Sequence, residues 1–246
     1  MDAPEVEAPE FDVPEFDALE IDALVLDVLG TLVDEPAGIR AGIRDLAPSL
    51  AGPAVDGLLQ LWQRHIDIEI RRIVDGSRPY IASDALDREA ARLVADAAGI
   101  DDPAAVAALA LAGRRLPTWP DTVLGLARLA EHFPLIGLSN ASRTALLGLN
   151  AHAGLRWHQA LSAEDARTYK PAPTVYELAV AVSGAPPERL LMVAAHAFDL
   201  RGAQKLGLRT AYVARPVGDP PTPSDRFDLY AEDLLDLADQ LGFPDA

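Results

Sequence analysis

The sequence predicts an α/β fold with a Rossmann-like, mostly parallel sheet and a helical cap inserted after the first strand. Several short segments are continuously apolar rather than alternating, which is typical of strands buried on both faces of a sheet. These segments are residues 23–28, 135–138, 160–162, 190–195 and 210–214. Helical patterns separate the segments, and strands that alternate with helices form parallel sheets covered on both faces.

Composition narrows the class of protein. Half of the 246 residues are hydrophobic, enough for one large domain or a core domain with a smaller attachment. The net charge of -17 repels nucleic acid and anionic membranes, so neither is an expected partner. No apolar stretch approaches the ~20 residues that span a bilayer, and the acidic N-terminus lacks a signal-peptide pattern. We therefore expect a cytoplasmic protein that acts on a small molecule.

The chain begins with an acidic segment, residues 1–20, that is interrupted by prolines. This composition predicts a solvated, disordered tail. The alternative is that Phe11 and Phe16 dock on the body of the protein or on a partner. Regular structure is expected to start at Ile21, and the α/β core is expected to comprise residues 21–35 and 117–246.

The segment 36–116 breaks the alternation of strands and helices, because its patterns are helical throughout. One apolar stripe consists of Leu58, Trp62, Ile66, Ile70 and Ile73. Ser83 is a plausible N-cap for a second helix, and Asp102 precedes the proline that opens a third. We expect this segment to form a cap over the catalytic edge of the sheet.

Polar side chains follow four of the predicted strands. Asp27 follows the first, Ser139 and Asn140 follow the second, Lys170 comes after the third, and His196 and Asp199 follow the fourth. Ligands of open parallel sheets bind beyond the carboxyl ends of the strands. The sequence therefore predicts that these side chains share one site.

The residues at the strand ends belong to motifs that resemble the haloacid dehalogenase superfamily. In order, the motifs are Asp27-Val28-Leu29-Gly30-Thr31, Leu138-Ser139-Asn140, Lys170-Pro171 and Ala195-His196-Ala197-Phe198-Asp199. Within this superfamily the stretch 169–178 is similar to the L-2-haloacid dehalogenases. The resemblance covers residues 21–240, and it implies a core of the superfamily type with a helical cap.

The resemblance leaves two chemistries to weigh. Phosphatases of the superfamily need magnesium, which prefers oxygen ligands in octahedral array, and they place an acid two residues after the nucleophile. Leu29 occupies that position here, and Ala195 stands where a second acid near the fourth strand is common. Only Asp27 and Asp199 remain, so we expect neither a metal nor another cofactor.

The dehalogenase branch implies that Asp27 displaces halide from the carbon beside a carboxylate. Water then hydrolyses the resulting ester to give a 2-hydroxy acid. Lys170 would keep Asp27 ionised, and Asp199 would orient Lys170 or polarise the water. The residues expected on the substrate are Thr31, Leu29, Ser139, Asn140, Tyr176 and Trp62, with Asn140 a candidate for holding the halide.

Two departures from the dehalogenase pattern leave alternatives open. Those enzymes carry an arginine just after a Leu-Trp pair in the cap, where this chain has Gln63 followed by Arg64. One residue along a helix is about 100° of rotation, so Arg64 is either a substitute with shifted register or a solvated side chain. His196 is either a general base or a residue that bonds a backbone carbonyl at the rim of the site.

Other functions remain open at this level. A phosphate ester or another electrophile is the alternative substrate, and a catalytically degenerate binder of small carboxylates is the non-enzymatic alternative. Similar enzymes often pair, so the resemblance suggests a homodimer.

Overall fold

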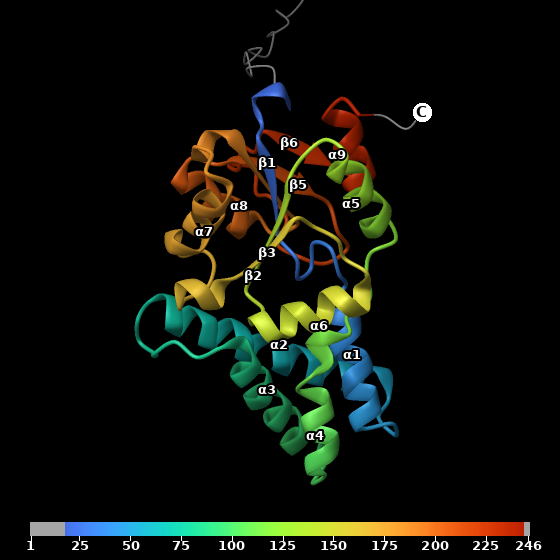
Figure 1. The fold of residues 1–246 in the computed structure, drawn as a ribbon. Helices are drawn as coiled ribbons and strands as arrows, with labels where there is room; N and C mark the ends of the chain where they lie inside the picture. Colours follow the sequence, from blue (N-terminus) through green and yellow to red (C-terminus); the bar gives the residue numbers. More distant parts are fainter. Residues whose placement is uncertain (1–17, 244–246) are drawn as a thin grey trace, which may run out of the picture.

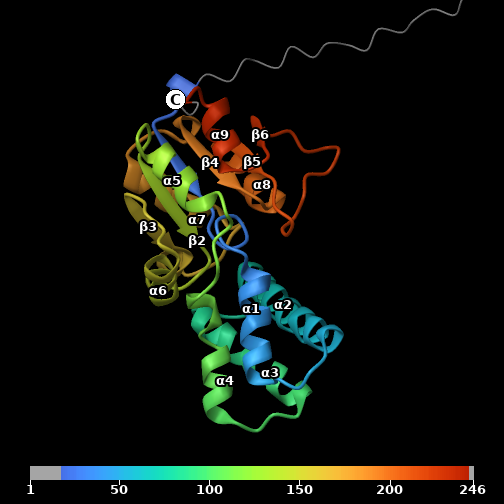
Figure 2. The same ribbon diagram turned by 90° about the vertical axis from the view of Figure 1, so that its right-hand side faces the viewer.

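The structure is a computed structural model that describes residues 18–243 (Figures 1 and 2). Six parallel strands form one sheet in the order β3-β2-β1-β4-β5-β6. The strands are β1 (Ala23–Leu26), β2 (Leu135–Ser139), β3 (Gln159–Ser162), β4 (Leu190–Ala194), β5 (Arg209–Val213) and β6 (Leu229–Ala231). The predicted parallel α/β fold is confirmed.

Helices cover both faces of the sheet, as the continuous apolar strands require. Leu24 and Leu26 of β1 pack into the same apolar cluster as Leu126, while Val25 packs into a second cluster with Val175. The first face is covered by α5 (Thr122–Ala130), α6 (Arg143–Ala153) and α9 (Leu234–Gln240), and the second by α7 (Pro173–Ser183) and α8 (Ala197–Leu206). Both faces of β1 are therefore buried, which is why its residues do not alternate in polarity.

Four further helices lie between β1 and β2 in the chain, beyond the carboxyl ends of the strands (Figure 1). They are α1 (Glu35–Leu46), α2 (Gly52–Val74), α3 (Ser83–Ala98) and α4 (Pro103–Leu109). Their apolar faces and those of the sheet share one apolar cluster, which contains both Ile43 and Leu26. The division into a core domain and a cap domain, with boundaries at residues 36 and 116, stays a prediction.

Several local expectations need correction. The first strand ends at Leu26, because Asp27 begins the turn that leaves the sheet. Ala82, not Ser83, is the N-cap of α3, since the Ser83 hydroxyl accepts a hydrogen bond from the Ser142 N–H at 2.8 Å instead of capping its own helix. Asp102 does cap α4, accepting from the Ala104 N–H at 2.9 Å. Ser83 fails to cap its helix because its hydroxyl bonds a residue distant in the chain, whereas Asp102 has no such contact among residues 18–243 and caps α4.

The N-terminal expectation is only partly within the described residues. Ala18–Glu20 form a short 3-10 helix, so regular structure starts before Ile21. The rest of the expected tail, with Phe11 and Phe16, lies outside the described residues. Between residues 18 and 243 no helix combines the length and apolarity that a membrane span needs.

Candidate active site

The site forms where the chain leaves β1 and β4, which are neighbours in the sheet. The strand order reverses here, and such switch points open a crevice for ligands in α/β sheets. Asp27 follows β1, and its N–H donates to the Val193 carbonyl of β4 at 2.9 Å. The turn after β4 leads directly into α8, whose first turn contains Asp199. The two acids are thereby brought to one edge from positions 172 residues apart in the chain (199 minus 27).

Lys170 joins these two acids. Its Nζ donates to Oδ1 of Asp27 at 2.9 Å and to Oδ2 of Asp199 at 2.7 Å, with the lysine side chain only 2% exposed. The backbone N–H of Lys170 donates to Oδ1 of Asn140 at 2.9 Å, so the residue after β2 fixes the loop after β3. The predicted contact between Lys170 and Asp27 is present, together with the predicted contact to Asp199.

Thr31 holds the other oxygen of the nucleophile candidate. Its Oγ1 donates to Oδ2 of Asp27 at 2.6 Å and accepts from the Ala195 N–H at 2.9 Å. Both carboxylate oxygens of Asp27 are therefore oriented, and the side chain keeps 8% of its surface exposed. Thr31 is fully buried, so it positions the carboxylate rather than reaching a ligand.

The loop between Asp27 and α1 is anchored from later parts of the core. The Trp119 indole N–H donates to the Gly30 carbonyl at 3.0 Å, and Nε of Arg215 donates to the Thr31 carbonyl at 2.9 Å. Arg215 is itself held by Asp121, at 2.7 and 2.8 Å from its two Nη atoms. The turn that presents Asp27 is therefore rigid before any ligand arrives.

Tyr176 completes the buried network. Its hydroxyl donates to Oδ1 of Asp199 at 2.7 Å, and the ring is fully buried. A Cβ at Gly202 would lie 2.4 Å from the tyrosine oxygen, so only glycine lets α7 and α8 approach closely enough for this bond. Tyr176 does not line the cavity and its hydroxyl bonds Asp199, so its expected contact with substrate stays a prediction.

The network sets the charge states of its members. Burial raises the pKa of Asp27, but the positive charge of Lys170, with smaller effects of His196 and Thr31, more than offsets burial and leaves that pKa below its usual value. Burial lowers the pKa of Lys170, and Asp199 and Asp27 together raise it above normal. Burial raises the pKa of Asp199, outweighing Lys170, and Asp27 adds to the rise. Asp27 is therefore the more readily ionised of the two acids.

His196 lies over the turn that follows Asp27. Its Nε2 is 3.2 Å from the Leu29 carbonyl oxygen, which accepts only, so Nε2 carries a hydrogen. Gly30 has φ of 79°, and a Cβ there would lie 2.5 Å from that nitrogen, so glycine is needed beside the imidazole. The predicted carbonyl contact is present, and Leu29 enters it through its backbone rather than its side chain.

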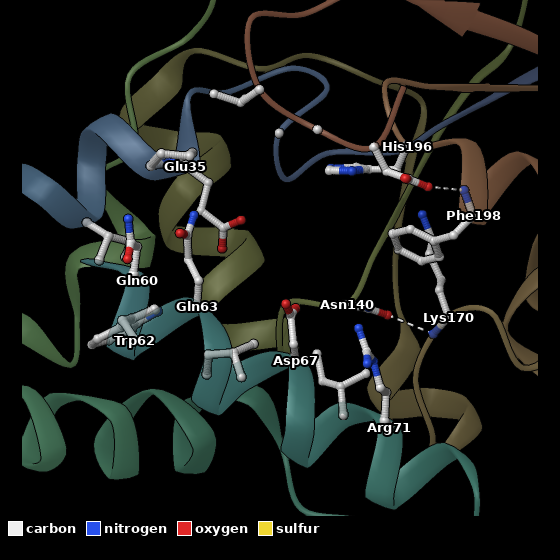
Figure 3. Close-up of a pocket in the computed structure, with 18 of the residues that line it drawn as sticks. Glu35, Gln60, Trp62, Gln63, Asp67, Arg71, Asn140, Lys170, His196 and Phe198 are labelled. Atoms are coloured by element: carbon white, nitrogen blue, oxygen red, sulfur yellow. Dashed lines mark hydrogen bonds between the residues drawn. The ribbon is translucent and has the colours of Figure 1, made fainter. Parts of the chain in front are cut away.

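A cavity of about 1280 Å³ separates this edge from α1 and α2 (Figure 3). Five of the predicted site residues line it, namely Trp62, Gln63, Asn140, Lys170 and His196. Asp27 does not line the cavity, but its Oδ1 is 2.9 Å from Nζ of Lys170, a residue that does. The remaining predicted residues do not line the cavity, namely Thr31, Leu29, Ser139, Tyr176, Asp199 and Arg64.

Two of these absences correct the expected substrate contacts. Ser139 is fully buried, and its Oγ accepts from the Ala141 N–H at 3.1 Å, so it shapes the turn after β2. Arg64 is exposed on α2 and does not line the cavity. Gln63, the preceding residue, does line the cavity (Figure 3). Because one residue along a helix is a rotation of about 100°, the two side chains leave α2 in different directions. The alternative in which a shifted helix register brings Arg64 to the site is therefore not seen.

Comparison with known proteins assigns the family. A family model described as a haloacid dehalogenase-like hydrolase matches residues 21–207. The chain belongs to the haloacid dehalogenase-like hydrolases. An (S)-2-haloacid dehalogenase of Xanthobacter autotrophicus is 33% identical over 162 residues, which are 64% of this chain and 63% of that enzyme. The chain therefore aligns with slightly less than two thirds of the length of this relative.

Solved structures extend the likeness of this haloacid dehalogenase-like hydrolase to nearly whole chains. A crystal structure of an L-2-haloacid dehalogenase superposes with a TM-score of 0.81 at 34% identity, covering 90% of this chain and 99% of that chain. An L-2-haloacid dehalogenase of Xanthobacter autotrophicus with chloropropionic acid covalently bound gives a TM-score of 0.76 at 26% identity, covering 90% and 98%.

Magnesium, which phosphatases of this superfamily use, does not fit the donors of this haloacid dehalogenase-like hydrolase. Asp27 and Asp199 both hold the Lys170 ammonium, so their oxygens face a cation already. Among residues 18–243 no group of three acidic or histidine side chains is placed to hold a metal ion. The donor set favours chemistry by side chains alone.

Sequence reasoning missed eight polar residues that line the cavity, namely Glu35, Arg40, Asp56, Gln60, Asp67, Arg71, Asp75 and Asp219. Glu35 begins α1, while Asp67 and Arg71 line the cavity from α2 together with Gln63. The spacing of 63, 67 and 71 is the helical repeat that places side chains on one face, and this signal was present in the sequence. The apolar stripe of α2 shows which side of the helix is buried, but it does not show which of the polar residues beside the stripe line the cavity.

Proposed function

We propose that this haloacid dehalogenase-like hydrolase catalyses the metal-independent, hydrolytic dehalogenation of a small (S)-2-haloalkanoic acid to a 2-hydroxy acid. The observation that supports it most directly is the carboxylate of Asp27, held at 2.9 Å by a buried lysine and at 2.6 Å by Thr31. An ionised, oriented carboxylate without a metal is suited to attack carbon. Relatives of this chain named for the same reaction add independent support.

In the first step, an Asp27 oxygen attacks C2 of the substrate and the C–halogen bond breaks, the halide leaving with the bonding electrons. Attack and departure lie on opposite sides of C2, so the halide faces the wall opposite Asp27, which α2 provides. Lys170 keeps Asp27 ionised before the attack. After the attack it balances the charge that remains on Asp199.

An anionic substrate needs a positive charge on the cavity wall, because acids outnumber bases among the lining residues. Arg40 is paired with Asp56 at 2.9 Å, and Lys170 is shared by two acids. Arg71 lines the cavity from α2 without an ion pair to any described residue. Figure 3 shows its guanidinium directed towards Asn140. We infer that Arg71 supplies the charge that Gln63 lacks.

The helices α1 to α4 are proposed to act as the cap of the site. Their support is the position of α1 and α2, which line the cavity opposite the sheet. Two further proposals rest on resemblance and composition, namely a homodimer and a cytoplasmic location. Sedimentation analysis of the purified protein tests the first, and fractionation of the source cells tests the second.

One experiment tests the proposed reaction. The purified protein is incubated with (S)- and (R)-2-chloropropionate in the presence of EDTA, and chloride and 2-hydroxypropionate are measured. We expect equal amounts of both products from the (S) form, and an ester on Asp27 in mass spectra of enzyme quenched during turnover. The Asp27→Asn variant is the control and should show neither product nor ester. Chloride release that EDTA abolishes, or the absence of any chloride, would contradict the proposal.

A further inference from the structure

The second step of the proposed reaction requires a base, and the buried network offers none. Water must lose a proton as it attacks the ester on Asp27. Both oxygens of Asp199 are already acceptors, one for Tyr176 at 2.7 Å and one for Lys170 at 2.7 Å, and the residue is 1% exposed. Asp199 therefore orients Lys170, and because it is buried and does not line the cavity, it is not exposed to a water there.

Glu35 is a carboxylate of the cavity wall that the first step does not use. It is the first residue of α1, eight residues after Asp27, and its helix is capped by Asp34. Its side chain is partly buried and lines the cavity, without a hydrogen bond or ion pair to any residue in the described range 18–243. In Figure 3 it projects into the same space as the imidazole of His196. Glu35 is therefore free to accept a proton.

The surroundings of Glu35 tune it for that task. Burial raises the pKa of this carboxyl to about 7, with His196 acting to lower it and Asp27 and Asp67 acting to raise it. Asp87 of α3 also interacts electrostatically with Glu35. A base is most effective when its pKa lies near the working pH.

We propose that Glu35 is the general base that activates the water for hydrolysis of the Asp27 ester. This inference rests on the proposed function and adds a catalytic residue to it. Glu35 takes a proton from water while the water oxygen bonds to the Asp27 carbonyl carbon. When the bond from that carbon to the substrate oxygen breaks, Glu35 returns the proton to this oxygen and releases the 2-hydroxy acid. Asp27 is left as a carboxyl and loses its proton to solvent, which balances the halide released earlier.

The first step prepares Glu35 for the second. While Asp27 is ionised, its negative charge raises the pKa of Glu35. Ester formation removes that charge, so the pKa of Glu35 falls and more of the residue is ionised when the water must be deprotonated. His196 is the rival base, because with Nε2 protonated its Nδ1 is the acceptor in the neutral ring.

Single-turnover kinetics of Glu35→Gln with (S)-2-chloropropionate test the assignment. We expect one equivalent of chloride per active site at the wild-type rate, accumulation of the ester on Asp27, and a fall of at least about 100-fold in steady-state turnover. Ester hydrolysis in the wild type should slow as pH falls through the ionisation of Glu35, and Glu35→Gln should lose this limb. Glu177→Gln, an exposed glutamate of α7 that does not line the cavity, is the matched control and should keep both the steady-state turnover and the pH dependence of the wild type.

Three results would overturn the assignment. Glu35→Gln could turn over with an unchanged pH profile, which would give the role to another group such as His196. The variant could lose the chloride burst, which would place Glu35 in the first step. Glu35→Asp could fail to recover any ester hydrolysis in a protein with native circular dichroism. Absence of chloride from the wild type in the same assay would instead contradict the proposed function.

Discussion

The two walls of the cavity differ in how their polar groups are satisfied. On the sheet side, Asp27, Lys170, Asp199 and Tyr176 form a closed network in which every charged group has a partner within 2.9 Å. On the wall formed by α1 and α2, Arg40 and Asp56 pair with each other at 2.9 Å, whereas Glu35 and Arg71 have no side-chain partner among the described residues. The first wall fixes its groups before binding, and the second leaves Glu35 and Arg71 for the ligand.

This contrast indicates a division of labour. A preorganised network can stabilise charge without rearranging during the reaction, so the sheet side is suited to bond making and breaking. The side chains of Glu35 and Arg71 on the other wall form no hydrogen bond or ion pair to described residues, so they are available to bind substrate, halide or water. Substitutions on the sheet side should therefore change stability and turnover together, whereas those on the wall formed by α1 and α2 should change function with little effect on folding.

The largest expected effect is that of Lys170→Met. The substitution leaves Asp27 and Asp199 buried together without their shared cation, and breaking a buried ion pair costs about 3–5 kcal/mol. We expect that loss in the free energy of unfolding from urea denaturation, together with loss of chloride release. An unchanged midpoint would show that the network does not stabilise the fold.

Tyr176→Phe should have a smaller effect on the same wall. It removes the hydrogen bond to Asp199 and leaves that oxygen unsatisfied, which costs about 1–3 kcal/mol. We expect reduced stability and a fall in kcat, because Asp199 would orient Lys170 less well. Tyr230→Phe, on the surface at 48% exposure, is the control. A decrease confined to the affinity for substrate would indicate instead that Tyr176 contacts the ligand.

Arg71→Gln tests the wall formed by α1 and α2, with Arg64→Gln as the matched control on the same helix. Loss of one charge–charge contact is worth about 1.4 kcal/mol, or tenfold, so we expect KM for 2-chloropropionate to rise about tenfold. Arg64→Gln should alter KM by less than about twofold. Stability should not change in either variant. Equal effects of the two substitutions would rule out a specific contact to Arg71.

The stability of the protein should also depend on pH, because Glu35 of the cavity wall is partly buried. The folded-state pKa of Glu35, about 7, lies above its unfolded value of about 4.5. The protonated carboxyl therefore favours the folded state below the lower value, and this stabilisation is lost as pH rises through about 7. The free energy of unfolding from urea denaturation should therefore decline between pH 5 and 8. Part of the decline should disappear in Glu35→Gln, and the remainder belongs to Asp87, whose pKa burial raises to about 8.

The sequence was sufficient to predict five of the six strands and the polar residues that follow them. Apolar runs identified five of the strands to within two residues, and Asp27, Lys170, His196 and Asp199 were located because parallel strands place their ends at one edge. β6 was not predicted, because three residues with the burial pattern half-exposed, exposed and buried have too little periodicity to read.

Residue types and their positions along the chain therefore determined the fold class and which side chains meet at one edge of the sheet, because both follow from local periodicity and strand order. Only the tertiary structure decided which polar groups are already satisfied. Tyr176 bonds Asp199 because Gly202 lets two helices approach, and Arg71 rather than Arg64 faces the cavity because of how α2 is rotated on the core. Hydrogen bonding and burial depend on neighbours distant in the chain, which no local pattern specifies.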